Sequence, residues 1–268
     1  MDKTRKITPR DLLALARQGE KIVTITAYDA TMARLAEAAG VQLLLVGDSM
    51  GNAILGHANT LAVTLAQSLH HTAAVVRGAR QAMVIGDMPF MSYHGSQDDA
   101  VLNAGRYLQE AGADGIKLEG GEAMAPLIAR MVQAGIPVMG HIGLLPQRVL
   151  VDSGYRIKGR AGAEAKRLIA DAQALQEAGA FAIVLEGMVS EVARQVTEAI
   201  KIPTIGIGAG PHCSGQIQVI TDLLGLDENF LPKHSRRYAN LAETIRTAIN
   251  CYGEDVRAGR FPGPDQSF

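Results

Sequence analysis

The chain has 268 residues, enough for one large α/β barrel or two smaller domains, and its formal net charge of −1 provides no field that would attract nucleic acid or an anionic membrane. Hydrophobic residues make up 47% and charged residues 20%, as in globular proteins, while an aromatic content of only 4% disfavours stacking on single-stranded nucleic acid. Two cysteines without metal-like spacing, a polar N-terminus and the lack of a long apolar run predict a cytoplasmic protein with no disulfide framework and no membrane segment.

The first predicted element is a helix. Thr8 is a typical N-cap residue, Pro9 fits the first helical position, and Gly19 provides an end. Apolar strand-like runs follow at residues 22–27, 42–48, 82–87, 116–119, 137–141, 181–186 and 203–208, with a weak eighth candidate at 217–220. Helices are expected at residues 31–39, 65–77, 97–110, 125–133, 164–178, 190–200 and 240–250.

Strands and helices therefore alternate, and most of the helices end at a glycine that leads into the next strand. Apolar strands buried on both faces are typical of a parallel sheet. Seven or eight such units favour a (β/α)8 TIM barrel over an open doubly wound sheet, which is the second interpretation. No low-complexity linker divides the chain, so we predict a single barrel domain over residues 1–268, with the N-terminal helix before strand one.

Five successive apolar runs each end in a polar side chain just before a glycine or a loop. These side chains belong to Asp48, Asp87, Glu119, His141 and Glu186. In a barrel, the carboxyl ends of the strands form the face that carries the active site. Since the five runs are neighbouring strands, we expect these side chains to converge on one side of the barrel mouth.

The acidic side chains of this group are candidate metal ligands. Asp48, Asp87 and Glu119 on adjacent strands would repel one another, and a shared cation would relieve that repulsion. Hard oxygen ligands suit Mg²⁺, which takes few protein carboxylates and completes its shell with water and substrate. Each aspartate alone is as readily explained as an N-cap of the loop that follows it.

The remaining polar residues suggest chemistry on an anion. Lys117 and Glu119 are two residues apart on a predicted strand and share a face, as a plain ion pair or as a substrate contact beside a cation. Glu186 lies farther round the barrel and is either a general base or a capping carboxylate. His141 is a hydrogen-bond donor, an acid or a histidine of the barrel core. The residues alone thus indicate a metal-assisted barrel enzyme acting on a small oxyacid.

These residues lie in segments that resemble the ketopantoate hydroxymethyltransferase family. The segments are TAYDATMARLAEAAG, LLVGDSMGN, HHTAAVVRGA, DMPFMSY, AGADGIKLEGG, IPVMGHIGLLPQ, IPTIGIGAG and FPGPDQSF. They cover most of the chain in the order of the family. The resemblance implies a (β/α)8 barrel of the phosphoenolpyruvate mutase-like group and a homo-oligomer, often a decamer.

The resemblance also implies a reaction. A hydroxymethyl group passes from 5,10-methylenetetrahydrofolate to the keto acid 3-methyl-2-oxobutanoate, through an enolate, to give 2-dehydropantoate for pantothenate and coenzyme A. By motif, Mg²⁺ is held by Asp48 and Asp87 directly and by Glu119 directly or through water. The substrate contacts implied in the same way are Asp48, Ser49, Asp87, Lys117 and His141. Glu186 matches the proton acceptor of the family.

Two other interpretations compete with this one. A related barrel lyase or mutase on another small oxyacid would usually carry a cysteine in a KKCGH-like loop, whereas Cys213 and Cys251 lie elsewhere. A non-catalytic binding protein on the same barrel would be expected to lack the base or a ligand, and neither is lacking. The chain departs from the family pattern in several loops, for example at Lys158, where glutamine is usual.

Overall fold

The computed structural model describes residues 5–228 and 230–268. Within them the chain forms two compact units, one reaching as far as Val219 and the other spanning Ile220–Phe268. The first unit contains all the strands. That both units act as a single domain, as the sequence predicts, stays a prediction.

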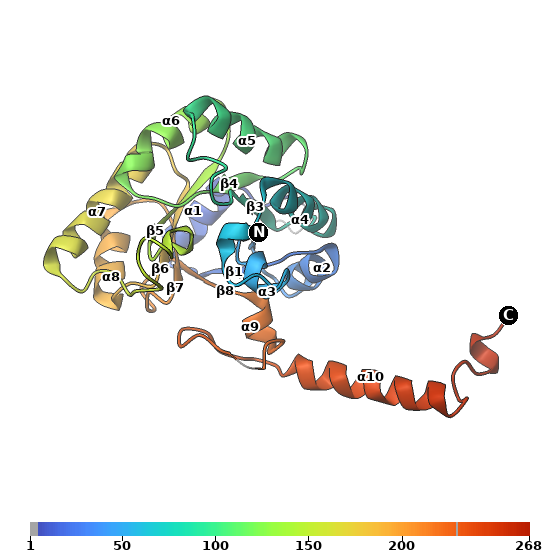
Figure 1. Ribbon diagram of the computed structural model, residues 1–268. Helices are drawn as coiled ribbons and strands as arrows, with labels where there is room; N and C mark the ends of the chain where they lie inside the picture. The colour runs from blue at the N-terminus through green and yellow to red at the C-terminus, as the bar shows by residue number, and fades with distance from the viewer. Residues whose placement is uncertain (1–4, 229) are drawn as a thin grey trace. The chain divides into compact units, whose positions relative to one another are not determined.

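The first unit is a closed barrel of eight parallel strands, in which each strand pairs with its neighbours in sequence and β8 pairs with β1 (Figure 1). The strands are β1 Ile22–Thr26, β2 Leu43–Val46, β3 Met83–Asp87, β4 Gly115–Lys117, β5 Val138–Gly143, β6 Ala182–Glu186, β7 Thr204–Ile207 and β8 Gly215–Gln218. The predicted TIM barrel is therefore confirmed. The weak eighth strand begins two residues earlier than the sequence suggested, because Gly215 already pairs with Ile22 and Ile205.

Helices connect the strands around the outside of the barrel (Figure 1). In this unit they are α1 Pro9–Arg17, α2 Ala30–Ala38, α3 Met50–Ala53, α4 Leu65–Gly78, α5 Gln97–Gln109, α6 Ala125–Gln133, α7 Gly162–Glu177 and α8 Ser190–Ala199, with short 3-10 turns η1 Thr60–Ala62, η2 Glu122–Met124 and η3 Pro146–Arg148. The predicted start of α1 is confirmed. Thr8 is its N-cap, and the Asp11 carboxylate accepts from the Thr8 backbone N–H at 2.9 Å.

The inward face of the strands is apolar in its lower half. Because side chains alternate along a strand, every second residue points into the barrel. The buried cluster that fills this half combines side chains from seven strands: Ile22, Leu43, Leu45, Met83, Ile85, Met139, Ala182, Val184, Ile205 and Ile217. The residues between them, such as Ile116, Val138 and Ile183, belong instead to the cluster packed against the outer helices.

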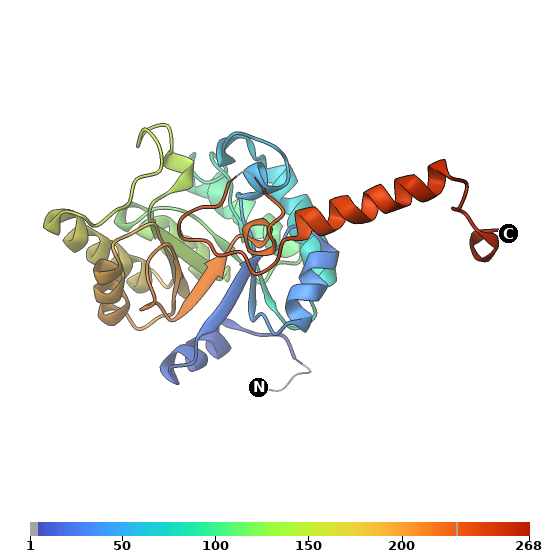
Figure 2. The same cartoon turned by 90° about the horizontal axis from the view of Figure 1, so that it is seen from below.

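Helix α1 closes the lower end of the barrel. Its buried residues Leu12 and Leu15 belong to the same cluster as the inward-facing strand residues. Figure 2 shows α1 at the end of the barrel opposite the loops that follow β2 and β5. This packing leaves the upper end, at the carboxyl ends of the strands, as the open mouth.

The second unit contains α9 Ile220–Leu224, α10 Leu241–Arg257 and the 3-10 turn η4 Pro264–Gln266. Helix α10 is longer than the predicted 240–250, because Gly253 lies inside it and the helix ends only at the cap residue Ala258. None of the helices in the described part of the chain has the length and apolar character needed to cross a membrane.

Candidate active site

The upper half of the barrel interior is charged. Asp87 follows Met83 and Ile85 at two-residue steps along β3, and Glu186 follows Val184 in the same way on β6. The inward side chains of β4 and β5 at this level are Lys117 and His141. Four of the polar residues singled out in the sequence therefore continue the inward face of the strands, above the apolar layers.

The structure differs from the expected strand ends at three of these residues. Strand β2 stops at Val46, so Asp48 lies in the turn after Gly47, and β4 stops at Lys117, two residues before Glu119. Strand β5 continues past His141 to Gly143, because His141 and the residues after it still pair with β6. Asp48, Glu119 and His141 nevertheless remain buried, with exposed fractions of 2 to 5%.

Lys117 pairs with Asp87 on the neighbouring strand. Its Nζ lies 2.8 Å from Asp87 Oδ1, and the other carboxylate oxygen of Asp87 accepts the backbone N–H of Asp48 at 3.0 Å. Behind Asp87, the hydroxyls of Ser68 and Tyr107 donate to its backbone carbonyl at 2.9 and 2.8 Å. The backbone of Asp87 is thus held from outside the barrel while its side chain reaches inward.

His141 lies between two of the predicted functional carboxylates. Its Nε2 is 3.3 Å from Glu186 Oε2, and its Nδ1 is 3.6 Å from Glu119 Oε1 and 3.3 Å from Lys117 Nζ. The side chain of Glu186 is 21% exposed, whereas the side chains of His141, Glu119 and Lys117 are only 2 to 4% exposed. Glu186 is therefore the carboxylate of this group that a molecule in the barrel mouth can reach most directly.

Ser49 lies at the edge of the same cluster. It is the N-cap residue of α3, and its Oγ shares a 2.8 Å hydrogen bond with the hydroxyl of the buried Tyr28. This hydrogen bond holds the hydroxyl of Ser49, the residue that follows Asp48 in the sequence.

Gln147 and Tyr93 belong to the cluster although the sequence analysis did not single them out. The amide of Gln147 donates to Asp48 Oδ2 at 2.9 Å, and its backbone N–H donates to Glu119 Oε2 at 3.1 Å. Tyr93 donates its hydroxyl to Gln147 Oε1 at 2.8 Å and accepts the Glu119 backbone N–H at 3.1 Å. The sequence signals were the positions of Tyr93 in the DMPFMSY segment and of Gln147 in the IPVMGHIGLLPQ segment, because an uncharged side chain in a loop has no distinctive pattern of its own.

Burial and mutual repulsion perturb the acidic side chains. Burial, followed by the charges of Asp87 and Glu119, raises the pKa of Asp48 well above its ordinary range. Burial also raises the pKa of Asp87, although Lys117 opposes the shift. Burial acts in the same direction on Glu119, but His141 and Lys117 outweigh it and the pKa of Glu119 is lowered.

The pKa values of the two basic side chains, Lys117 and His141, are raised, although burial alone would lower them. Burial lowers the pKa of Lys117, but Asp87, Glu119 and Asp48 outweigh it, so the pKa is raised. Burial and Lys117 lower the pKa of His141, yet Glu119 and Glu186 raise it to about 9 overall. Four carboxylates therefore share one lysine and one histidine, which leaves the cluster with an excess of negative charge.

The donor set fits a hard divalent cation. Glu119 Oε1 is buried and makes no hydrogen bond, and Asp48 and Asp87 present further carboxylate oxygens beside it. Among the described residues, no group of three or more acidic, histidine or cysteine side chains is arranged so that it could hold a metal ion as it stands. Two of the carboxylate oxygens are engaged by other side chains, Asp87 Oδ1 by Lys117 and Asp48 Oδ2 by Gln147. Mg²⁺ needs only one or two carboxylates, with water and substrate in its other positions, so the residues present suit it.

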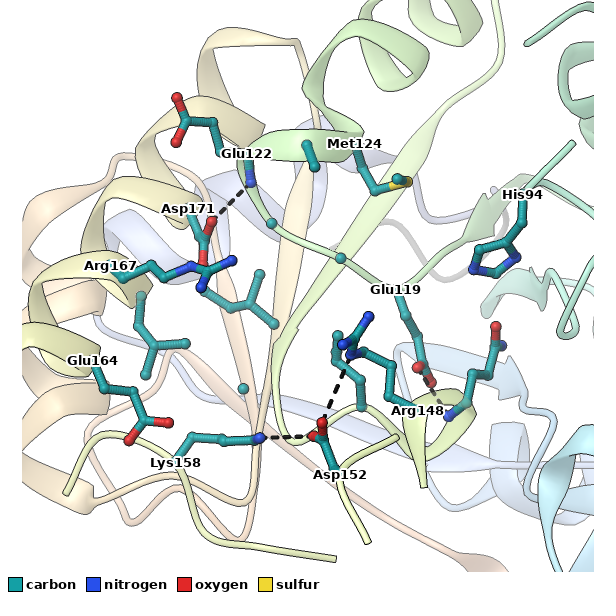
Figure 3. Close-up of a pocket in the computed structure, with 18 of the residues that line it drawn as sticks. His94, Glu119, Glu122, Met124, Arg148, Asp152, Lys158, Glu164, Arg167 and Asp171 are labelled. Atoms are coloured by element: carbon teal, nitrogen blue, oxygen red, sulfur yellow. Dashed lines mark hydrogen bonds and ion pairs between the residues drawn. The ribbon is translucent and has the colours of Figure 1, made fainter. Parts of the chain in front are cut away.

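A pocket of about 660 Å³ opens beside this cluster; we call it the Glu119 pocket (Figure 3). Its floor consists of Tyr93, Glu119 and Gln147. Its walls are the segment 120–124 and helix α7, and residues of the loop after β5 border it. Because Gln147 also donates to Asp48, the floor of the pocket adjoins the carboxylate cluster.

Solved structures with the same fold define the class of the protein. Phosphonopyruvate hydrolase in complex with oxalate and Mg²⁺ superimposes with a TM-score of 0.62 at 16% identity, covering 97% of this chain and 93% of that one. A 2,3-dimethylmalate lyase of the PEP mutase/isocitrate lyase superfamily gives a TM-score of 0.60 at 20% identity, covering 98% and 92%. The chain is therefore a (β/α)8 barrel with the same fold as these enzymes.

Sequence comparison identifies the family. The family model for ketopantoate hydroxymethyltransferase matches residues 6–264. The 3-methyl-2-oxobutanoate hydroxymethyltransferase of Chloroflexus aurantiacus is 57% identical over 262 residues, which cover 98% of this chain and 92% of that relative. The chain belongs to the ketopantoate hydroxymethyltransferase family, and it is an enzyme of the one-carbon transferase class.

Proposed function

We propose that the protein transfers a hydroxymethyl group from 5,10-methylenetetrahydrofolate to 3-methyl-2-oxobutanoate, giving 2-dehydropantoate. The observation that carries the proposal is the charged upper layer of the barrel, in a chain that matches its family from residue 6 to residue 264. A small keto acid is an anion with adjacent oxygens, and this layer offers carboxylates for a cation, Lys117 for negative charge and Glu186 for a proton.

Asp48 and Asp87 would hold Mg²⁺, with Glu119 bound directly or through a water molecule. The hydrogen-bond partners of these carboxylates support that assignment, since Gln147 and Lys117 orient them as outer-shell groups do in metal sites. When bound, Mg²⁺ supplies Lewis acidity that draws electron density from the carboxylate and keto oxygens of the substrate.

The chain binds and orients the keto acid through its own polar groups. Lys117 provides a fixed positive charge, because the buried carboxylates around it raise its pKa and keep it protonated. Ser49 contributes a hydroxyl that Tyr28 holds in place. His141, with its Nε2 beside Glu186 and its Nδ1 beside Glu119, contacts the substrate or product between them.

Glu186 takes the proton from C3 of the keto acid. The carbanion at C3 then forms a bond to the methylene carbon of the folate. Over the whole reaction the methylene carbon loses both of its bonds to nitrogen, water supplies the new hydroxyl oxygen, and the nitrogens of tetrahydrofolate regain protons. His141 Nε2, at 3.3 Å, steadies the carboxylate of Glu186 for this transfer.

Proton exchange at C3 tests the proposal. 3-Methyl-2-oxobutanoate is incubated in D₂O with Mg²⁺ and without folate, and the loss of the C3 proton is followed by NMR for the wild type, Glu186→Gln and a control, Glu198→Gln, on the exposed face of α8. We expect Mg²⁺-dependent exchange that falls by about 10²- to 10⁴-fold in Glu186→Gln only. A folded, Mg²⁺-loaded wild type that does not exchange with or without tetrahydrofolate would refute the proposal.

We also expect the protein to work as a homodecamer in the cytoplasm. Both cysteines are free, which suits a reducing compartment. Light scattering coupled to size exclusion measures the assembly directly, and a monomer at micromolar concentration would contradict this expectation.

A further inference from the structure

The Glu119 pocket offers more room than the proposed keto acid requires. The groups assigned to the keto acid lie in the carboxylate cluster, on the other side of Gln147 from most of the pocket. At about 660 Å³ the pocket lies within the range of about 300–1,000 Å³ that holds drug-sized ligands. A second, larger substrate is therefore the natural occupant.

We propose that this pocket binds the folate co-substrate, with the methylene bridge that it donates facing the Glu119 floor and the carboxylates of the glutamyl tail between Arg148 and Arg167. The proposal rests on the proposed hydroxymethyl transfer and adds the place and the chemistry of its second substrate. A folate consists of a flat ring system, a benzoyl spacer and an anionic tail, and the pocket lining offers apolar side chains for the rings and arginines for the tail.

Two arginines at the outer part of the pocket are available for an anion. Arg167 extends from α7 and Arg148 from η3 toward the space between them (Figure 3). Among the described residues, Arg167 makes no ion pair or side-chain hydrogen bond, and Arg148 has only a loose contact of 3.9 Å between its Nε and Asp152 Oδ1. Guanidinium groups bind carboxylates through paired hydrogen bonds, so the two arginines suit the two carboxylates of a glutamyl tail.

Three of the five acidic residues that line the pocket are engaged by other groups of the protein. Asp152 is paired with Lys158 at 2.7 Å, and Glu164 accepts the backbone N–H of Gly159 at 2.6 Å. Asp171 accepts the backbone N–H of Glu122 at 2.8 Å, and it fits there because a Cβ on Gly121 would overlap its carboxylate. These contacts spread the negative charge of the acids over protein donors and leave the arginines to the ligand.

The pocket also has an apolar part that is suited to a ring. The apolar side chains of Met124, Ile142, Leu145 and Leu168 contribute to its lining. The floor then connects to the carboxylate cluster, since Gln147 binds Asp48 Oδ2 on one side and lines the pocket on the other. A folate bound in this direction brings its methylene bridge next to the keto acid.

A comparison of two ligands tests this placement. Binding of tetrahydrofolate and of tetrahydropteroate, which lacks the glutamyl tail, is measured by calorimetry on the whole protein with Mg²⁺ and 3-methyl-2-oxobutanoate present. The variants are Arg167→Ala, Arg148→Ala and the control Lys166→Ala, which removes the neighbouring exposed cation of α7 that does not line the pocket.

We expect each arginine variant to bind tetrahydrofolate about 5- to 10-fold more weakly than the wild type, because it lacks one exposed charge-assisted contact. The affinity for tetrahydropteroate should stay within about twofold of the wild type. Added salt should weaken the binding of tetrahydrofolate more than the binding of tetrahydropteroate in the wild type. This difference between the two ligands should be smaller in the arginine variants. The control should match the wild type with both ligands.

The outcomes separate this proposal from the one on which it rests. If the wild type binds both ligands but the arginine variants leave their ratio unchanged, the placement is wrong while the folate-dependent reaction stands. If the wild type binds neither ligand although it exchanges the C3 proton, folate is not the donor and both proposals are wrong.

Discussion

The lower and upper halves of the barrel interior are built on the same strands but do opposite things. Strand β3 carries both: Met83 and Ile85 lie in the apolar lower layers, and Asp87, two residues on, lies in the charged upper layer. The apolar layers gain free energy by leaving water. The charged layer loses free energy by the same burial, as the raised pKa of Asp87 records.

This difference shows where the fold is stabilised and where it is committed to function. The lower layers are closed by α1 and need no ligand, whereas the upper layer holds four carboxylates with too few cations around them. A protein that only had to be stable would continue the apolar pattern to the top of the strands. Changes in the two halves should therefore affect stability and activity in different proportions.

The largest effect is expected from Asp48→Asn. Turnover and C3 exchange should fall by about 10³-fold or more, since loss of an outer-shell group alone costs 10- to 100-fold and this residue is a proposed ligand. Because the buried Asp48 is repelled by Asp87 and Glu119, the variant should be more stable than the wild type in EDTA. Calorimetric melting with and without Mg²⁺ measures this; equal Mg²⁺ stabilisation of both proteins would contradict the ligand assignment. Asp265→Asn, at an exposed site in η4, is the control.

In the lower layer, Leu43→Ala should reduce stability and leave activity nearly unchanged. Leu43 is fully buried among the barrel-core residues, so truncation should lower the free energy of unfolding by about 2–5 kcal/mol. C3 exchange per folded molecule should stay within about twofold. Leu102→Ala, the same truncation at a residue 69% exposed on α5, should cost less than about 0.5 kcal/mol in urea unfolding. A large loss of exchange in folded Leu43→Ala would mean that the two halves are not separate.

Gln147→Met probes the link between the two carboxylates that share this residue. The substitution keeps the length of the side chain but removes the hydrogen bonds to Asp48 and from Tyr93. We expect Mg²⁺ affinity, measured by calorimetry, to fall by about 10- to 100-fold, as for other outer-shell groups. Gln133→Met, at the exposed end of α6, should bind Mg²⁺ as the wild type does, and an unchanged affinity in Gln147→Met would remove Gln147 from the site.

The smallest expected effect is a pH-dependent change in stability at the lower end of β3, where Glu37 binds the backbone. Partial burial opposes ionisation of Glu37, but the backbone N–H groups of residues 80–82, just before that strand, outweigh it and lower the pKa of Glu37. A carboxylate with a depressed pKa contributes stability above its ordinary value of 4.5, and this stability is lost as the pH falls through the folded-state pKa.

Glu37→Gln should therefore be less stable than the wild type at pH 7 by about 1 kcal/mol, after allowance for solvent screening. The difference should shrink in urea unfolding below pH 4.5, while C3 exchange at pH 7 stays the same. Glu177→Gln, at the exposed end of α7, should show neither effect. A difference that persists at low pH would mean that the charge of Glu37 is not responsible.

Much of the fold and of the site could be predicted because their signals are local. Alternating runs, helix-ending glycines and the start of α1 at Thr8 and Pro9 depend on neighbours in sequence. The end of a strand is less local, so β5 continues past His141 and β4 stops before Glu119. Polar residues after apolar runs marked the candidate cluster, and Gln147 escaped notice because its role depends on a partner 99 residues away.

The sequence by itself determined the barrel, its order of strands and the set of charged side chains at their ends, because hydrophobic periodicity specifies which face of each strand is buried. The tertiary structure alone decided which of these side chains contact one another. Closure of the barrel pairs Lys117 with Asp87 instead of its near neighbour Glu119, sets His141 against Glu186, and opens the Glu119 pocket beside them. Such contacts depend on register between strands and on loops that fold over the mouth, and neither is encoded in a local pattern.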